Sequence, residues 1–190
     1  MVKLFWTILL WLSQALSRNG ELGGFVHDTA FSQYIPPTLF HCVTGTWTWV
    51  AGTVTDTIAK HKAAGDETSI INIPIVIPSN SVAGKGALLK SIEVDYKITT
   101  DSPTSITPLV NLVTRGVEGA VAVVTTPAFT QSPDAAGLIT ADEHKLVVTI
   151  TTPFYIDNDQ YVLLELTDVS GAAGAVLDLY GAVANYTLRV

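Results

Sequence analysis

An uninterrupted alternation of apolar and polar residues between positions 92 and 99 restricts the fold more than any other feature of the sequence. Its apolar positions are Ile92, Val94, Tyr96 and Ile98. Its polar positions are Glu93, Asp95, Lys97 and Thr99. A period of two residues is that of a β-strand with one buried face and one solvated face. The rest of the chain is therefore expected to supply strands that cover the buried face.

Short segments with strong β propensity recur along the chain, separated at intervals of about ten residues by turn signals. No segment of helical periodicity between them is long enough for a crossover between parallel strands. Residues 60–67 are interpreted as a polar turn, and residues 127–142 as a long connection. About eight or nine strands with long connections predict an all-β fold, an antiparallel β-sandwich of jelly-roll type. An immunoglobulin-like sandwich is disfavoured because its Cys…Trp…Cys spacing is missing.

Two of the expected strands contain a residue that predicts a local irregularity. Pro74 lies within the apolar segment 68–78, and because proline cannot donate to a ladder, we expect an edge or a bulge there. The apolar positions within residues 175–190 change parity once. Gly181 stands where a β-bulge would produce that change.

An apolar block at residues 4–16 precedes the β-rich part of the chain. As a helix, it would place on one broad face Phe5, Ile8, Leu9, Leu12 and Leu16. A secretory signal peptide is one interpretation, favoured by the positive start and by small residues at Ala15 and Ser17. A membrane span is disfavoured, because about 13 helical residues measure about 20 Å, against a hydrocarbon core of roughly 30 Å. The third interpretation is a retained helix whose five apolar side chains are oligomer contacts.

The chain is predicted to divide into three parts. The apolar N-terminal helix occupies residues 1–18, and an arm or linker that contains glycine and proline occupies residues 19–38. Aromatic residues within this arm indicate that it is docked on a surface. The β-sandwich domain occupies residues 39–190.

The composition suits a subunit that is covered by neighbours, although a heat-stable monomer could show it as well. Charged residues make up 14% of the chain and hydrophobic residues 48%, whereas a typical soluble domain has about 25% charged residues. We therefore expect a homo-oligomer. The formal net charge of −7 disfavours nucleic acid as a partner, because such binding needs a basic face. The single cysteine, Cys42, excludes an intrachain disulfide.

Motifs of catalysis and cofactor binding are missing from the sequence. It contains no Gly-x-Ser-x-Gly elbow, no Walker loop and no Gly-x-Gly-x-x-Gly. The four histidines, His27, His41, His61 and His144, lack the spacing of a metal site and are interpreted as solvated or packed. The sequence therefore predicts no enzyme, with no catalytic residue, cofactor or metal.

Two clusters leave a binding role open. Asp157, Asn158 and Asp159 place three oxygen-bearing side chains in one loop, which a calcium ion could use. A hairpin turn needs the same residue types and is favoured, because no downstream Glu is in register for calcium. Trp47 and Trp49 lie two residues apart, so they would share one face of a strand as a sugar platform, although such pairs more often belong to a core.

One order of segments extends over roughly residues 45–190. It consists of Gly-Thr-Trp-Thr at residues 45–48, an Ile-rich strand with proline, and the segments 84–98, 125–129, 161–166 and 179–183. This order resembles small β-sandwich proteins common among phage and environmental viral structural genes. The resemblance implies a virion component of jelly-roll type, often a trimer.

The leading hypothesis from the sequence is a structural virion protein, namely a capsid, decoration or tail component. It would be located in the virion and would assemble with itself and with other virion proteins through its N-terminal arm and its sandwich surfaces. The alternative is an extracellular protein, either a secreted cell-surface or filament subunit or a carbohydrate-binding module.

Overall fold

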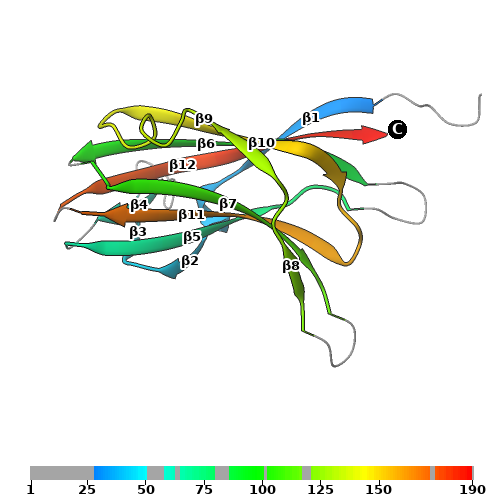
Figure 1. Ribbon diagram of the computed structural model, residues 1–190, viewed down its shortest axis with the longest axis horizontal. Coiled ribbons are helices and arrows are strands. Elements are labelled where there is room, and N and C mark those ends of the chain that lie inside the picture. Colours follow the sequence, from blue (N-terminus) through cyan, green and yellow to red (C-terminus); the bar gives the residue numbers. More distant parts are fainter. Residues whose placement is uncertain are drawn as a thin grey trace, which may run out of the picture.

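The computed structural model describes residues 28–50, 58–62, 65–79, 86–100, 102–116, 121–171 and 174–189. Two antiparallel sheets pack face to face in this part of the chain (Figure 1). The predicted N-terminal helix and its oligomer contacts Phe5, Ile8, Leu9, Leu12 and Leu16 lie outside the described residues. Among the described residues, no helix is long and apolar enough to cross a membrane.

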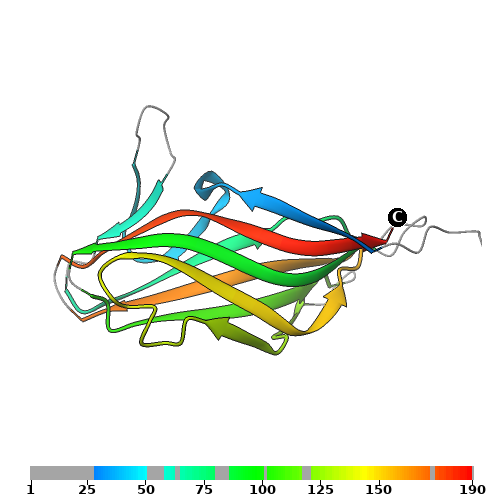
Figure 2. The same ribbon diagram turned by 90° about the horizontal axis from the view of Figure 1, so that it is seen from above.

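Sheet A contains seven strands in the order β3-β4-β12-β6-β10-β9, with β1 also paired to β12. The strands are β1 (Asp28–Ile35), β3 (Trp47–Val50), β4 (Ile58–Lys62), β6 (Ala87–Thr100), β9 (Phe129–Ser132), β10 (Glu143–Tyr155) and β12 (Val176–Arg189). Figure 2 shows the long strands β6, β10 and β12 side by side.

Sheet B contains five strands in the order β2-β5-β11-β7-β8. They are β2 (His41–Thr44), β5 (Glu67–Ile75), β7 (Ser105–Thr114), β8 (Val123–Thr125) and β11 (Gln160–Ser170). A 3-10 helix, η1 (Pro37–Leu39), connects β1 in sheet A to β2 in sheet B. All of these pairings are antiparallel, which confirms the predicted antiparallel sandwich.

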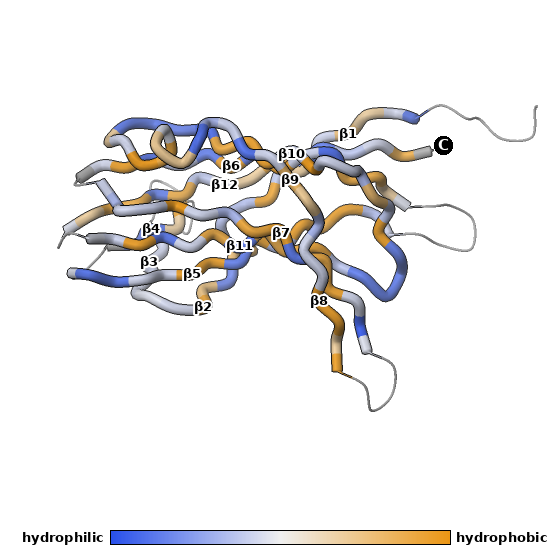
Figure 3. The backbone as a smooth tube through the Cα atoms, in the orientation of Figure 1, coloured by the Kyte–Doolittle hydropathy of each residue, from blue (hydrophilic) through white to orange (hydrophobic). Residues whose placement is uncertain are grey.

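The core lies between the two sheets, and the predicted alternation of β6 supplies its centre. The inward side chains Ile92, Val94, Tyr96 and Ile98 are buried, as the sequence predicts. From sheet B, the alternate positions of β11 that face them are Val162, Leu164 and Leu166. Figure 3 shows the same alternation of hydropathy along the strands. Burial of such side chains stabilises a fold by about 1.5–3 kcal/mol each.

The bulge predicted at Gly181 is present. The register between β12 and β6 shifts between Leu179 and Gly181, and Gly181 has a φ of +145°. Leu177 and Leu179 are buried before it and Ala182 after it, so the inward positions change from odd to even numbers. A residue without a side chain allows this change because it tolerates positive φ.

Two short strands share one side of β12. β4 pairs with residues 176–179 of β12, and β1 pairs with residues 182–189. Tyr180 and Gly181 fall between these two pairings, so neither β1 nor β4 pairs with them. The other side of β12 pairs with β6 along nearly its whole length.

Two segments differ from their sequence-based predictions, and one agrees with its prediction. The polar turn predicted at residues 60–67 is wrong at its start, since Ile58–Lys62 is β4 and His61 is fully buried. The predicted connection at 127–142 contains the strand β9. The proline expectation is met, because β2 pairs with β5 only as far as Asn72 and leaves the position of Pro74 at an edge.

The segment predicted as an arm contributes a strand to sheet A over part of its length. Residues 28–35 form β1, which pairs in register with β12. The Phe31 ring stacks on the Tyr186 ring with centroids 5.8 Å apart. The described part of the arm is therefore held by a ladder of backbone hydrogen bonds and by aromatic contact.

Candidate functional site

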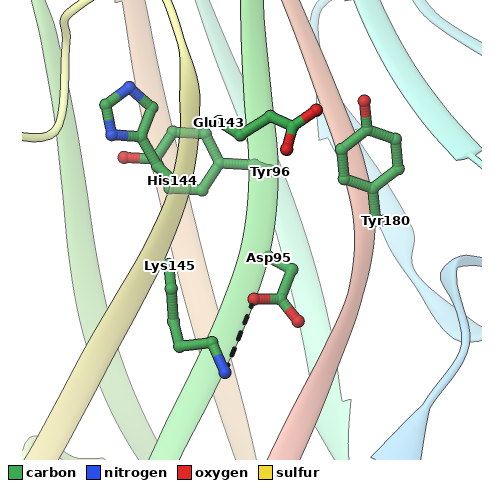
Figure 4. Close-up of a pocket in the computed structure, with 6 residues that line it drawn as sticks. All are labelled: Asp95, Tyr96, Glu143, His144, Lys145 and Tyr180. Carbon is green, nitrogen blue, oxygen red and sulfur yellow. Dashed lines mark ion pairs between the residues drawn. The ribbon is translucent and has the colours of Figure 1, made fainter.

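Polar side chains from three strands meet on the outer face of sheet A. The odd-numbered residues of β6 point outward there, because its even-numbered residues from 92 to 98 fill the core. The register places Lys145 of β10 opposite Asp95 of β6, and Val183 of β12 opposite Glu93. A depression of about 350 Å³ lies on this face (Figure 4). It is lined by Asp95, Tyr96, Glu143, His144, Lys145 and Tyr180.

Ion pairs hold the charged side chains of this face in place. Lys145 Nζ lies 3.0 Å from Glu93 Oε2 and 3.9 Å from Asp95 Oδ1. Lys97 Nζ lies 3.4 Å from Glu143 Oε1. The hydrogen bond from Lys145 holds the pKa of Glu93 below its ordinary value, and the same bond raises the pKa of Lys145. Glu93 is therefore ionised near neutral pH, and both lysines have partners.

A hydrogen-bonded chain extends this network toward β1. Asn185 Nδ2 donates to Glu93 Oε1 at 2.8 Å and to Ser91 Oγ at 3.2 Å. Ser32 Oγ of β1 donates to Asn185 Oδ1 at 2.6 Å. Polar groups with fixed orientation thus cross the sheet from β1 through β12 and β6 to Lys145 of β10.

The aromatic part of the site lies where neither β1 nor β4 pairs with β12. Tyr34 of β1 places its ring against the Cα of Gly181, so close that an added Cβ would lie 2.6 Å from ring atom Cε2. Its hydroxyl donates to the backbone oxygen of Tyr180 at 2.8 Å, which satisfies a carbonyl next to the bulge. The Tyr34 residue is still 58% exposed. A ring is therefore fixed on the surface and remains open to a ligand.

Tyr180 and His144 border the depression itself. Burial, and then the charge of Asp178, raise the pKa of the Tyr180 phenol. The His144 ring stacks on Tyr96 with centroids 5.0 Å apart, and its Nε2 lies 2.6 Å from the carbonyl oxygen of Thr140. Figure 4 shows the charged ends of Asp95 and Lys145 close to each other. His144 of β10 and Tyr180 of β12 lie on opposite sides of β6.

The tryptophan pair considered from the sequence does not form a platform of two exposed rings. Trp47 packs against the core, donates from Nε1 to the carbonyl oxygen of Thr44 at 3.1 Å, and lies 5.2 Å from the ring of His61. Trp49 is 38% exposed. The core interpretation therefore holds for Trp47.

A buried polar group between the sheets was missed by sequence reasoning, and we call it the His61 cluster. His61 Nδ1 on β4 lies 2.7 Å from Asp168 Oδ2 on β11, and Ser69 Oγ lies 3.3 Å from the same nitrogen. Ser170 Oγ donates to Asp168 Oδ2 at 3.4 Å. Serine and aspartate approach the same ring nitrogen, whereas a catalytic triad places them on opposite nitrogens. The cluster therefore links sheet A to sheet B, and it is fully buried.

The remaining candidates from the sequence lie apart from one another. Residues 157–159 form the turn between β10 and β11, where the Gln160 backbone N–H donates to the Asp157 carbonyl at 3.0 Å. This is the hydrogen bond of a β-turn, and because β10 and β11 belong to different sheets, the turn connects the two sheets and is not a hairpin. His41 is exposed on β2, and His27 lies outside the described residues. Within the described ranges, no group of three or more histidine, cysteine or acidic side chains suits a metal ion.

Comparisons with known proteins give structural neighbours and no sequence relatives. No family model matches the chain, and no curated protein matches it. A family 29 carbohydrate-binding module from Piromyces equi is similar, with 12% sequence identity and a TM-score of 0.41. The match covers 83% of this chain and 91% of that module. A chain described among carbohydrate-binding modules of the β-sandwich superfamily has 10% identity and a TM-score of 0.41, with 85% of this chain and 58% of that chain covered.

A third similar structure is a xylanase 10B from Clostridium thermocellum that contains a CBM22-1 module and a GH10 module, complexed with xylohexaose. Identity is 8%, 86% of this chain and 28% of that chain are covered, and the TM-score is 0.41. Identities and TM-scores are low in all three of these structures, so the ligand of the present chain has to be argued from its own side chains.

These comparisons correct the leading hypothesis from the sequence. The prediction of a structural virion protein is wrong: the similar structures described above are carbohydrate-binding modules or contain one. None of them is a viral structural β-sandwich of the kind that the sequence resembles.

Proposed function

We propose that this chain is an extracellular carbohydrate-binding module whose ligand lies across the outer face of sheet A. One observation carries the proposal: the exposed ring of Tyr34 is fixed against Gly181, beside Tyr180 and a continuous set of hydrogen-bonding side chains. The apolar face of a sugar ring packs on an aromatic ring, as other apolar groups do. Sugar hydroxyl groups both donate and accept hydrogen bonds, so carboxylates and lysines in one row serve them well.

The site is organised before any ligand arrives. Glu93 is held from two sides, by Lys145 at 3.0 Å and by Asn185 at 2.8 Å. The Tyr34 ring is held by its hydroxyl and by contact with backbone. Side chains that are already ordered lose little conformational entropy on binding, which favours affinity.

The charge balance of the face favours a neutral polysaccharide. Lys145 is paired with Glu93 and Asp95, and Lys97 is paired with Glu143. Neither lysine is left to bind the carboxylate or sulfate group of an acidic polysaccharide. An anionic chain would instead approach a group of three carboxylates and two ammonium groups, and like charges repel.

A jelly-roll topology is the finer description that we propose for the sandwich. From β4 to β7 and from β10 to β12, successive strands alternate between the sheets, since β4, β6, β10 and β12 belong to sheet A while β5, β7 and β11 belong to sheet B. Eight of the strands then follow the order β4-β12-β6-β10 in one sheet and β5-β11-β7-β8 in the other. Jelly rolls are frequent among lectin domains, in which the sheet faces are wide enough to carry a binding site. No catalytic step is part of the proposal.

Isothermal titration calorimetry with soluble neutral and acidic polysaccharides tests this function. We expect binding of at least one neutral polymer and a loss of about 2 kcal/mol, about thirtyfold in Kd, for Tyr34→Ala. Tyr161→Ala is the matched control, because Tyr161 is 50% exposed but belongs to sheet B. Equal affinity of the Tyr34 variant and the wild type would refute the site. Absence of binding to every neutral polymer would refute the function.

A further inference from the structure

The outer face of sheet B differs from that of sheet A in its charge. Inward positions of its three central strands are occupied by buried residues such as Ile71 and Leu164. The alternate positions therefore face outward, namely 70–74 in β5, 163–169 in β11 and 105–111 in β7. Among these described outward positions, Glu165 is the one ionised side chain, and its neighbours are mostly Ile, Leu, Val, Thr and Asn.

This distribution of charge leaves one face open to a second copy of the chain. The formal net charge is −7, so two copies repel one another at most orientations. On sheet A the outward side chains include Glu93, Asp95 and Glu143. On sheet B the same repulsion is limited to Glu165, while Leu163 and Leu109 offer apolar area to a partner.

The area of this face is sufficient for a specific contact. Four strands, β2, β5, β11 and β7, lie side by side. With strands about 4.8 Å apart and about 3.4 Å per residue along them, the face measures roughly 600 Å² per copy, or roughly 1,200 Å² for a pair. Specific interfaces begin at about this size. Two such faces pack about 10 Å apart, as the two sheets of one sandwich do.

We propose that two copies of the chain associate back to back through the outer faces of sheet B. The contact is isologous, so each residue of the face meets the same face on the partner and a two-fold axis closes the assembly. Glu165 lies in the middle of β11, between Asn72 of β5 and Leu109 of β7. It therefore comes close to the axis, where its charge opposes the association and limits the affinity.

The exposed apolar hairpin of sheet B adds to this surface. β8 and the end of β7 extend beyond the body of the sandwich (Figure 1). Val123 and Val124 of β8 are 58% and 56% exposed. Both belong to the same sheet as the proposed interface, so the hairpin is placed to contact the partner at its rim. If the proposed function holds, the dimer presents its two sheet A faces on opposite sides and binds two polysaccharide chains.

Sedimentation velocity of the full chain without any sugar tests the dimer, so its outcome does not depend on the proposed function. Across about 1 µM to about 1 mM, the range expected of a small interface, we expect a reversible monomer–dimer equilibrium. Thr107→Glu and Leu163→Glu each place a further carboxylate on the face beside Glu165 and should each raise Kd at least tenfold, about 1.4 kcal/mol. Glu165→Gln should lower Kd severalfold.

Val147→Glu is the matched control, because Val147 faces outward on sheet A opposite Glu93. It should leave the dimer Kd unchanged. Thr107 is exposed, so its replacement tests the interface even if the Leu163 variant fails to fold, and circular dichroism checks both. A wild type that stays monomeric over the whole range overturns the proposal. So does a dimer that tolerates Thr107→Glu or that is weakened by Val147→Glu.

Discussion

Replacing Gly181 by alanine perturbs the backbone and the candidate site together. The φ of +145° at this residue is one that an alanine rarely adopts, and holding a residue with a side chain there costs about 1–3 kcal/mol. The added Cβ would also lie 2.6 Å from the Tyr34 ring. That ring must move, and its hydrogen bond to the Tyr180 carbonyl would be lost at a cost of about 1 kcal/mol. We therefore expect Gly181→Ala to lower the free energy of unfolding by about 2–4 kcal/mol.

Urea denaturation followed by circular dichroism measures this change as a shift of the urea concentration at which half of the protein is unfolded. The dependence of the unfolding free energy on urea concentration should be the same in both proteins. The contribution of the ring separates in a double-mutant cycle with Tyr34→Ala, in which Gly181→Ala should cost about 1 kcal/mol less than in the wild type. Gly65→Ala is the matched control, because a Cβ at Gly65 meets nothing within 4 Å. Its effect should stay within about 0.5 kcal/mol.

Two results would refute this reasoning about Gly181. If Gly181→Ala is as stable as the wild type, neither the positive φ nor the contact with Tyr34 constrains the strand. If its cost is the same with and without the Tyr34 ring, the two residues are not coupled. Calorimetry adds a further readout, since displacement of the ring should weaken carbohydrate binding about as much as Tyr34→Ala does.

The other predictions concern charge. Asp168→Ala should lower the free energy of unfolding by about 3 kcal/mol in urea denaturation, since it leaves the fully buried His61 without the carboxylate 2.7 Å away; a change below about 1 kcal/mol would contradict this. For Glu93, the lowered pKa means that its pairing with Lys145 stabilises the fold above the ordinary glutamate pKa and is lost as pH falls through the folded value. A carbon-13 titration of Glu93 should show a midpoint below the ordinary value, and Lys145→Gln should raise it; an unchanged midpoint in the variant would contradict the pairing.

Local patterns in the sequence were sufficient for the long strands. The alternation from Ile92 to Thr99 predicted the central strand of sheet A, and the change of parity predicted the bulge at Gly181. Each signal is contained in a few neighbouring residues. β4 was missed because its inward residues are Ala59 and His61, which carry no β-branched signal. The partner that makes a buried histidine acceptable there, Asp168, is 107 residues away.

The candidate site could be predicted only in part, for a related reason. The outward polar positions of β6 were visible as the solvated half of its alternation. Their aromatic neighbours were not, because Tyr34 and Tyr180 are separated by 146 residues and meet only through strand pairing. The two tryptophans formed the stronger local signal, but Trp47 is needed by the core. The two neighbouring tryptophans therefore predicted a different sugar platform from the Tyr34 site that we propose.

The outer face of sheet A is uneven because β1 and β4 pair with separate parts of β12. A single long strand in their place would have extended its ladder past Tyr180 and Gly181 and produced an even, featureless sheet. Because two short strands stop on either side of these residues, the break admits an aromatic side chain from one of them. Altering the chain length on either side of this break would change the shape of the surface while the hydrophobic interior stayed the same.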